Sequence, residues 1–397
     1  MRKILLTAAC VSLSLLISGS LPGAAPAAAA DDAAMLSPTH AFVRLWQAPG
    51  AFEKIAFASV DGKTLYLGGV PRGLEAVEVE TGLVKWMHPG VLPPDFPPVG
   101  NGQILCLVEG GRLVVLNPET GEELSRAKPR FSLFTSAYPA AAGYCMFASG
   151  DQYVYAVRIE NGAKMWRSAI DGVPTASAWN GNALMCFTTS AGILYSVSIP
   201  TMEISWHYQF PRESCSAPVL AGNIIYIGSS DYYLYAIDTL IGDVQWKLSL
   251  SAPVLEPPLV VGSRVYAATT EKLIHAVDLN TQKDLWTLPG DRPLTTTPEH
   301  LIFLRKDKDV NVIGMADVAT GKVISEMTAE RYVLFAGQAE GGIIYAVGKT
   351  GDVLAIGDRA AIQARDAAKE AARKAALTAP TAAPSAAPTA PAEAPKP

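Results

Sequence analysis

The sequence predicts an all-β fold, an eight-bladed β-propeller of four-stranded antiparallel blades, and three observations support this prediction. Six of the seven tryptophans recur at one phase of a period of about 40 residues: Trp46, Trp86, Trp166, Trp206, Trp246 and Trp286. Ser125 and Ser325 stand where the period lacks a tryptophan, so the period is marked eight times at steps of 39 to 41 residues. The text between these positions reads as short β-rich runs separated by turn residues. A fixed period of this length with strand-like text indicates equal, repeated supersecondary units.

The repeat around Trp246 illustrates the elements expected in each unit. Four β-rich runs joined by tight turns lie at 216–220, 224–228, 233–238 and 244–248. A glycine marks the turn before the tryptophan strand, where we expect a positive φ, at positions 82, 121, 162, 242 and 321. Met202 and Gln282 replace this glycine in two repeats, so the turn accepts other residues. Four antiparallel strands in such a repeat are typical of a propeller blade, whereas a solenoid, the alternative, needs polar caps at both ends.

The two ends of the repeat region complement each other. The chain begins with a lone tryptophan strand at 42–46, and its last unit, 332–357, has three strands and lacks that one. Pairing the two closes a ring and leaves no open sheet edge. We expect each tryptophan to pack between neighbouring blades while its indole N–H reaches a backbone carbonyl. Ser125 and Ser325 should then mark the two least tightly packed junctions.

The segments outside the repeats differ in composition. We expect a secretory signal peptide at 1–30, a linker at 31–40, the propeller at 41–358, an alanine-rich charged helix at 359–377 and a disordered Ala/Pro-rich tail at 378–397. The signal peptide predicts a protein secreted across the inner membrane into the periplasm or cell envelope. Nothing later in the sequence is long and apolar enough to be a transmembrane segment.

Charge and cysteine content exclude some classes of protein. Without Arg2 and Lys3, 30 Lys and Arg residues stand against 37 Asp and Glu, a net charge of −7 that argues against nucleic acid as a partner. No Cys-x-x-Cys occurs, which disfavours zinc and thiol-redox sites. Four cysteines lie beyond the signal peptide, mostly in apolar strands that favour buried thiols, and their spacing does not choose among the three possible pairings: Cys106, Cys145, Cys186 and Cys215.

The repeated pattern Ala-x-Asp-x-x-Thr-Gly-x-x-x-Trp, with variants such as 76–86 and 236–246, resembles the tryptophan-docking motif of the pyrroloquinoline-quinone (PQQ) propeller family. The resemblance covers about residues 40–358 and implies one of two branches. Quinoprotein dehydrogenases bind PQQ and Ca²⁺ in the central funnel. The other branch resembles the B component of the outer-membrane β-barrel assembly machinery, a scaffold without catalysis.

The dehydrogenase branch makes demands that this sequence does not meet. Those enzymes typically carry a pair of adjacent cysteines and long insertions, whereas here no two cysteines are adjacent and all seven intervals keep to 39–41 residues. We therefore expect no PQQ and no calcium. The sequence departs from the lipoproteins of the scaffold branch because it has no cysteine placed for lipidation after the apolar core of the signal peptide, and because it carries the Ala/Pro-rich tail.

Other candidate chemical sites have simpler interpretations. Asp238, Asp278 and Asp317 open the turn of their repeats, where an Asp side chain caps its own backbone. The segment 307–311 has the first spacings of a calcium loop but lacks its glycine and its terminal glutamate, so we read it as a hairpin tip. The five histidines form no close pair, and no Ser/His/Asp arrangement is recognisable in the sequence. We expect no catalytic, cofactor-binding or metal-binding residues.

The sequence thus predicts an exported, monomeric, non-enzymatic scaffold for protein–protein interaction. Its partners would be other envelope proteins, including a β-barrel assembly machine. Two alternatives remain open: a small PQQ- or sugar-binding propeller that uses its central funnel, and a cell-wall-linked structural protein. Preorganised aromatic and arginine side chains in two interblade loops are the candidate partner-binding residues: Leu92, Phe96, Arg130, Phe131 and Phe134. The competing interpretation is that these side chains plug the channel or pad the junction between blades.

Overall fold

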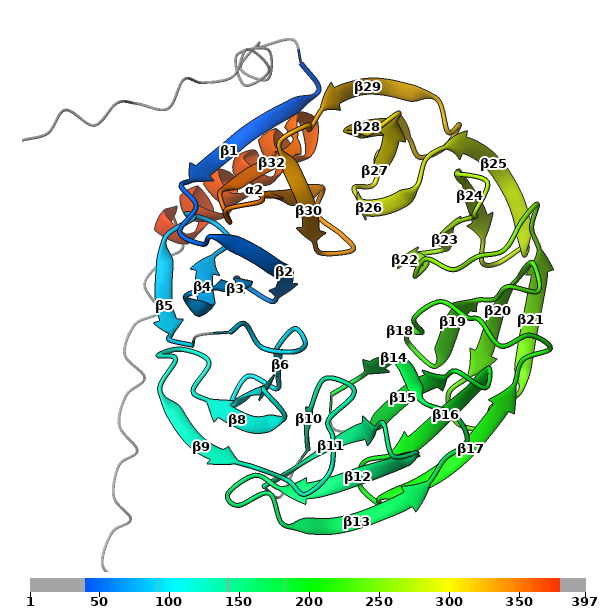
Figure 1. Ribbon diagram of the computed structural model, residues 1–397. Helices are drawn as coiled ribbons and strands as arrows, with labels where there is room; N and C mark the ends of the chain where they lie inside the picture. The colour runs from blue at the N-terminus through cyan, green and yellow to red at the C-terminus, as the bar shows by residue number, and fades with distance from the viewer. Residues whose placement is uncertain (1–39, 91, 141–142, 182, 379–397) are drawn as a thin grey trace, which may run out of the picture.

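The computed structural model describes residues 40–90, 92–140, 143–181 and 183–378. Eight four-stranded antiparallel sheets stand around a central channel, each with one strand near the channel and one at the outer rim (Figure 1). The predicted eight-bladed propeller is therefore confirmed. The segment predicted as a signal peptide lies outside the described residues, as do the linker apart from His40 and the Ala/Pro-rich tail apart from Thr378, which is the last residue of the C-terminal helix.

The blades are numbered 1 to 8 along the chain. Blades 1 to 4 comprise β2 (Lys54–Asp61), β3 (Thr64–Val70), β4 (Gly73–Glu78) and β5 (Val84–His88); β6 (Val99–Gly100), β7 (Leu105–Glu109), β8 (Arg112–Leu116) and β9 (Glu123–Ala127); β10 (Tyr138–Ala140), β11 (Tyr144–Ser149), β12 (Tyr153–Arg158) and β13 (Lys164–Ala169); β14 (Pro174–Trp179), β15 (Leu184–Thr189), β16 (Ile193–Ser198) and β17 (Glu203–Gln209). Blades 5 to 8 comprise β18 (Val219–Ala221), β19 (Ile224–Gly228), β20 (Tyr233–Asp238) and β21 (Val244–Ser249); β22 (Leu259–Val261), β23 (Arg264–Ala268), β24 (Leu273–Asp278) and β25 (Lys283–Pro289); β26 (Arg292–Thr296), β27 (His300–Asp307), β28 (Val310–Asp317) and β29 (Val323–Thr328); β30 (Tyr332–Gly337), β31 (Ile343–Gly348), β32 (Val353–Asp358) and the N-terminal strand β1 (Phe42–Ala48).

Blade 8 is assembled from both ends of the repeat region. Strand β1 pairs antiparallel with β32, from Phe42 opposite Asp358 to Ala48 opposite Val353. The side chain of Phe42 is fully buried in the core of this blade. The predicted closure by the N-terminal strand is confirmed, and it supplies a hydrogen-bonded partner to the strand edge that blade 8 would otherwise expose.

Each outer strand carries a β-bulge directly before its tryptophan or serine position. In blade 1, Trp86 lies opposite Ala76 and Val84 lies opposite Val77, so Lys85 is the additional residue. The same register shift occurs at the same place in all eight blades. Because a bulge changes which face the next side chain takes, it sets the direction of the indole toward the following blade.

The residue paired with the position behind each bulge is small where that position is a tryptophan and larger where it is a serine. The residue opposite the tryptophan is alanine in five blades and Ser196 in the sixth. Opposite Ser125 and Ser325 stand the larger Val115 and Met315, both fully buried. The larger partner residues thus fill part of the volume that each missing indole leaves. The expectation of two loosely packed junctions did not include this compensation.

The turn glycine of the next blade explains why the indole fits. Built onto Gly82, Gly121, Gly242 or Gly321, a Cβ atom would lie 2.5–2.6 Å from the indole of the preceding blade. These four glycines have positive φ, as predicted. The tryptophans that they face, Trp46, Trp86, Trp206 and Trp286, each donate Nε1–H to a carbonyl oxygen of that same turn at 2.8–3.0 Å.

The two remaining tryptophans face turns without a glycine. Met202 and Gln282 take up the positive φ at those turns, and no such indole hydrogen bond forms from Trp166 or Trp246 among the described residues. Ser125 also forms a hydrogen bond to the turn of the next blade, because its Oγ donates to the carbonyl oxygen of Ile159 at 2.9 Å. Close docking of the indole therefore depends on a glycine in the facing turn of the neighbouring blade.

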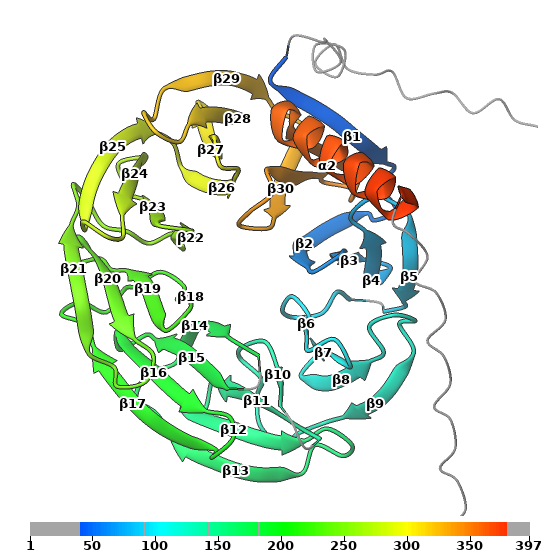
Figure 2. The ribbon, with the colours of Figure 1, turned by 180° about the vertical axis from the view of Figure 1, so that it is seen from behind.

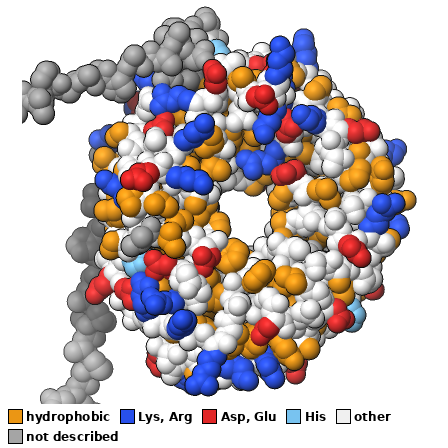
Figure 3. Space-filling model, viewed as in Figure 1, with side chains coloured by type: hydrophobic (Ala, Val, Ile, Leu, Met, Phe, Trp, Pro, Cys, Tyr) orange, Lys and Arg blue, Asp and Glu red, His pale blue; other side chains and the backbone are white. Residues whose placement is uncertain are grey.

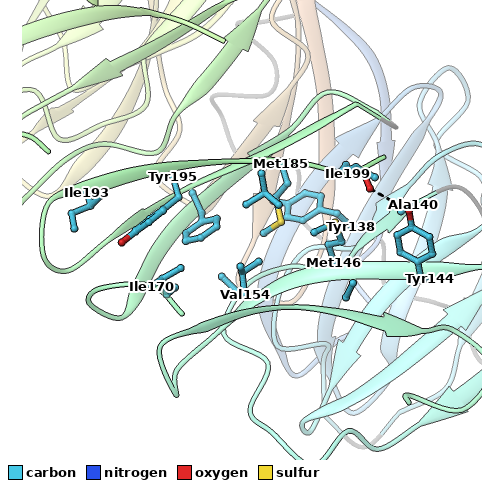
Figure 4. Packing of buried hydrophobic residues seen from close by; sticks show 14 residues of the cluster. Tyr138, Ala140, Tyr144, Met146, Val154, Ile170, Met185, Ile193, Tyr195 and Ile199 are labelled. Atoms are coloured by element: carbon cyan, nitrogen blue, oxygen red, sulfur yellow. Dashed lines mark hydrogen bonds between the residues drawn. The ribbon is translucent and has the colours of Figure 1, made fainter. Parts of the chain in front are cut away.

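The hydrophobic cores lie between blades as well as within them. In the cluster shared by blades 3 and 4, Met146 and Val154 of one sheet pack with Met185 and Tyr195 of the next (Figure 4). Tyr144 Oη donates to the carbonyl oxygen of Ile199 at 3.2 Å. In the next blade the equivalent carbonyl, that of Thr239, accepts its hydrogen bond from the indole of Trp206. The junction between blades 3 and 4 thus combines apolar packing with one polar link to the turn of the next blade.

Strand alternation gives the ring two distinct faces. Turns between the first and second and between the third and fourth strands of each blade lie on one face, which also carries α2 (Arg359–Thr378), seen in front in Figure 2. The blade-to-blade connections and the turns between second and third strands lie on the opposite face, here called the connection face. Asp358 caps α2 by accepting the backbone N–H of Ala360 at 3.0 Å. Within the described residues, no helix has the length and apolar character needed to span a bilayer.

Candidate interaction surface

The two loops singled out from the sequence lie side by side on the connection face. Residues 89–98 join blade 1 to blade 2, residues 128–137 join blade 2 to blade 3, and Ser136 Oγ donates to the carbonyl oxygen of Pro97 at 3.2 Å. Asp95 fixes the first loop, because its N–H donates to the Val108 carbonyl at 2.6 Å and its carboxylate accepts from Gly111 N–H at 3.2 Å. These loops are therefore held in place by their own blades and by each other.

Two of the five candidate residues are part of the core. Phe131 stacks on Tyr155 with ring centroids 3.9 Å apart and planes inclined by 9°. Phe96 is half-buried against the same hydrophobic cluster between blades 2 and 3. These two phenylalanines contact the hydrophobic cluster at the junction between blades 2 and 3, as the padding interpretation expects.

The other three candidates are accessible. Leu92 is 61% exposed and Phe134 is 47% exposed, with the Phe134 ring lying directly against Gly150. The side chain of Arg130 is also exposed. Figure 3 shows this side of the ring, with apolar and charged side chains interspersed around the open channel. Leu92 and Phe134 therefore contribute apolar area to the connection face.

Three further exposed apolar side chains on this face were not predicted. Tyr232 is in the turn between the second and third strands of blade 5, Leu255 is in the connection from blade 5 to blade 6, and Val333 is at the start of blade 8. In the sequence, a signal for Tyr232 is that it is the one aromatic residue of an otherwise polar turn, Ser229-Ser-Asp-Tyr232. Together with Leu92 and Phe134 they form what we call the apolar ring of the connection face.

A cavity of about 640 Å³ lies beside the channel between blades 6, 7, 8 and 1. Lys272, Arg292 and Lys306 contribute positive charge to it, and Glu256 and Asp291 contribute negative charge. Burial lowers the pKa of Arg292, whose Nη2 donates to the carbonyl oxygen of Phe335 at 3.1 Å. The charges of this cavity are nearly balanced.

The turn aspartates have the structural role predicted for them. The carboxylates of Asp238, Asp278 and Asp317 accept backbone N–H groups of their own turns at 2.7–2.8 Å. Hydrogen bonds from Thr281 and Thr320 lower the pKa of Asp278 and of Asp317, respectively. In the part of the chain that the structure describes, no group of three or more His, Cys, Asp or Glu side chains is arranged to hold a metal ion.

One Ser–His–Asp arrangement exists that the sequence did not reveal. Ser251 Oγ lies 3.3 Å from His275 Nε2, and His275 Nδ1 lies 2.6 Å from a carboxylate oxygen of Asp284. The residues come from the connection between blades 5 and 6 and from two strands of blade 6, so only the fold brings them together. Catalysis by such a triad also needs a substrate pocket with oxyanion donors. His275 is buried, and we interpret Ser251 and Asp284 as the hydrogen-bond partners that its two ring nitrogens need inside the protein.

The structure also brings together two of the four cysteines. Cys106 and Cys145 belong to the cluster between blades 2 and 3, both are buried, and both are free thiols. The hydrogen bond between them, followed by burial, raises the pKa of the Cys145 thiol. Burial raises the pKa of Cys186 and of Cys215 to about 12. Thiols with raised pKa values form little thiolate and react slowly.

The fold, the bulge-directed tryptophans and the glycine turns define a closed eight-bladed propeller of the tryptophan-docked type, with a rigid ring and two loop-bearing faces. The family model of the outer membrane protein assembly factor BamB matches residues 43–179 and 150–371, and the chain belongs to this family. A search of curated proteins found no significant match.

Two solved structures share the fold. BamB from Moraxella catarrhalis superposes with a TM-score of 0.64 at 14% identity, covering 80% of this chain and 98% of that one. The computationally designed Ika8 protein superposes with a TM-score of 0.63 at 15% identity, covering 79% of this chain and 99% of that one. At such identities the likeness concerns the arrangement of the backbone.

Proposed function

We propose that this chain is an exported, non-enzymatic scaffold that binds other envelope proteins and acts in outer-membrane protein assembly. The observation that carries the proposal is the apolar ring of the connection face, formed by exposed side chains on a propeller of the assembly-factor family. A scaffold of this kind has to hold a binding surface still, and the closed ring with its docked tryptophans does so.

Physical considerations support the connection face as the working surface. Large apolar and aromatic side chains in ordered loops are favoured at the centres of protein interfaces. The bond between Ser136 and Pro97 and the anchoring of Asp95 order the two loops before a partner arrives, which reduces the entropic cost of binding. The apolar ring is formed by loops of several blades, so a partner would contact more than one blade at once.

We also propose that the protein works without PQQ or Ca²⁺. The absence of adjacent cysteines and of insertions supports this, and so do the nearly balanced charges of the cavity beside the channel. Adding PQQ and Ca²⁺ to the purified protein should leave the melting temperature unchanged and produce no dye-linked oxidation of alcohols or sugars. A shift of the melting temperature at micromolar PQQ would favour the alternative of a ligand-binding funnel.

The scaffold proposal is tested by a paired substitution on each face. Leu92→Ser with Phe134→Ser removes part of the apolar ring, whereas Leu240→Ser with Ile241→Ser removes two apolar side chains that are at least as exposed from the face that carries α2. Crosslinking in the native envelope, followed by mass spectrometry, should show that the first pair loses an outer-membrane assembly component and that the control pair keeps it.

The level of folded outer-membrane β-barrel proteins gives a second readout. It should fall in cells that carry the first pair and stay unchanged with the control pair. Equal effects of the two pairs would contradict the assignment of the connection face. Crosslinks to peptidoglycan instead of protein would favour the cell-wall-linked alternative.

A further inference from the structure

The junction between blades 2 and 3 is one of two, together with the junction between blades 7 and 8, whose outer strand has a serine in place of the tryptophan. Gly162, in the turn that would face an indole, lies against Ala127 and Pro129 instead. Beside it a groove of about 490 Å³ runs between the connection leaving blade 2 and the sheet of blade 3. We call this the cationic groove; its lining includes Lys128, Arg130, Phe131, Asp151, Tyr155, Lys164 and Arg167.

The charge in the groove is strongly one-sided. Lys128, Arg130, Lys164 and Arg167 all line it with exposed side chains, and no carboxylate of the described residues lies within ion-pair distance of any of them. The acid in the lining, Asp151, accepts a hydrogen bond from Tyr155 Oη at 2.7 Å.

Some bases on the outer strands of other blades are paired, whereas Lys247 of blade 5 lies over an aromatic ring. Arg126 contacts both Glu109 and Glu123, and Arg305 contacts Glu326. Four cations without a carboxylate at ion-pair distance line this one groove, which is a local excess of positive charge in a chain whose net charge is −5.

The floor of the groove is apolar and fixed. Phe131 stacks on Tyr155, and Phe147 lies behind both rings at 5.7 and 5.9 Å. The hydrogen bond from Tyr155 to Asp151 holds the phenol in place. A ligand would meet a preorganised aromatic surface flanked by cations, so little side-chain entropy is lost on binding.

The register of blade 3 sets the spacing of two of the cations. Lys164 lies opposite Val157 and Arg167 lies opposite Tyr155, with the bulge at Met165 between them. Both side chains therefore point to the same side of the sheet, two residues apart on the partner strand, which is about 7 Å. Acidic side chains at alternate positions of an extended peptide have the same spacing.

We propose that the cationic groove binds an extended acidic peptide segment with Asp or Glu at alternate positions. The carboxylates would pair with Lys164 and Arg167, and Lys128 and Arg130 would bind from the opposite wall. The intervening apolar side chains would lie on Phe131. The groove opens on the outer flank between two blades, so the proposal does not depend on which protein occupies the connection face.

The experiment is a fluorescence-anisotropy titration of the full chain with a labelled hexapeptide, Glu-Leu-Glu-Val-Glu-Leu, and with its Gln counterpart. Binding of the Glu peptide should be saturable and weaken at high salt, and the Gln peptide should not bind. Lys164→Gln with Arg167→Gln should weaken binding about five- to tenfold, because two charge-assisted contacts are lost. The melting temperature should stay within about 2 °C, since both side chains are exposed.

Blade 5 offers a matched control. Lys247 lies opposite Tyr235 and over the ring of Tyr233 at 4.7 Å, as Arg167 lies opposite Tyr155 and over Tyr153 at 4.5 Å. Lys247→Gln should leave peptide affinity unchanged. An equal loss with this control, or no saturable binding of the Glu peptide at low salt, would overturn the proposal. Binding of phosphatidylglycerol–phosphatidylcholine vesicles in place of the peptide, reduced by the groove substitutions, would equally overturn it by assigning the site to lipid headgroups.

Discussion

Replacing Gly242 by alanine should destabilise the propeller through the indole that docks on it. Gly242 has φ +77°, and a Cβ atom there would lie 2.6 Å from the ring of Trp206. Trp206 Nε1 donates to the carbonyl oxygen of Thr239 at 2.9 Å in the same turn. An alanine methyl group would displace the indole from the turn, so the substitution disturbs both the packing and the hydrogen bond of this junction.

The expected magnitude follows from two contributions. A non-glycine residue in the left-handed region costs about 1–2 kcal/mol. Loss of the indole hydrogen bond and of part of its packing adds about 1–2 kcal/mol. We therefore expect Gly242→Ala to lower the free energy of unfolding by about 2–4 kcal/mol.

Gly222, in the same blade, is the matched control. It has φ +59°, and a Cβ atom there would meet nothing within 4 Å, so Gly222→Ala carries the backbone cost alone. Urea unfolding followed by circular dichroism should place the control about 1–2 kcal/mol below the parent chain and Gly242→Ala lower by at least another 1 kcal/mol. Two variants that agree within about 0.5 kcal/mol would refute the reasoning, because the turn would then need glycine for its backbone conformation only.

Three further predictions concern the ring closure, the thiols and the Ser–His–Asp arrangement. Deleting residues 31–48 removes the strand that completes blade 8 and should lower the melting temperature more than deleting 359–397; a truncation that melts like the parent chain would contradict closure. Cys106 and Cys145 should react with a thiol reagent only after unfolding, because both are buried and the pKa of the Cys145 thiol is raised; mass spectrometry that finds them joined in a disulfide would contradict this. A fluorophosphonate probe should not label Ser251, and labelling that Ser251→Ala abolishes would identify the chain as a hydrolase.

The period of the sequence was enough to predict the blades, because strand, turn and tryptophan positions repeat locally. Closure was predictable from the complementary ends, and the positive φ of the turns from their glycines. The larger residues opposite the two serines could also have been found in the sequence. Val115 and Met315 stand ten residues before Ser125 and Ser325, at a repeat position that is alanine or serine in the other repeats.

The features that were missed depend on how neighbouring blades meet. The sequence left open whether Phe96 and Phe131 pack or dock, because this depends on the path of two loops over an adjacent sheet. Ser251 reaches His275 only because one interblade connection passes over blade 6. The cationic groove likewise combines residues of two blades. Local periodicity carries no information about such contacts, so they required the three-dimensional arrangement.

The seam in blade 8 sets the order in which the propeller can be completed as the chain folds. Strand β1 ends at Ala48, but the three strands that it joins begin only at Tyr332. If the chain crosses the membrane from its N-terminus, β1 emerges first and waits, with Phe42 and Trp46 uncovered, until the last repeat arrives. Contacts of such large sequence separation form late in folding. A chain that folds in this order would pass through an open, crescent-shaped stage, in which a strand edge and an aromatic strand are both accessible to chaperones and proteases.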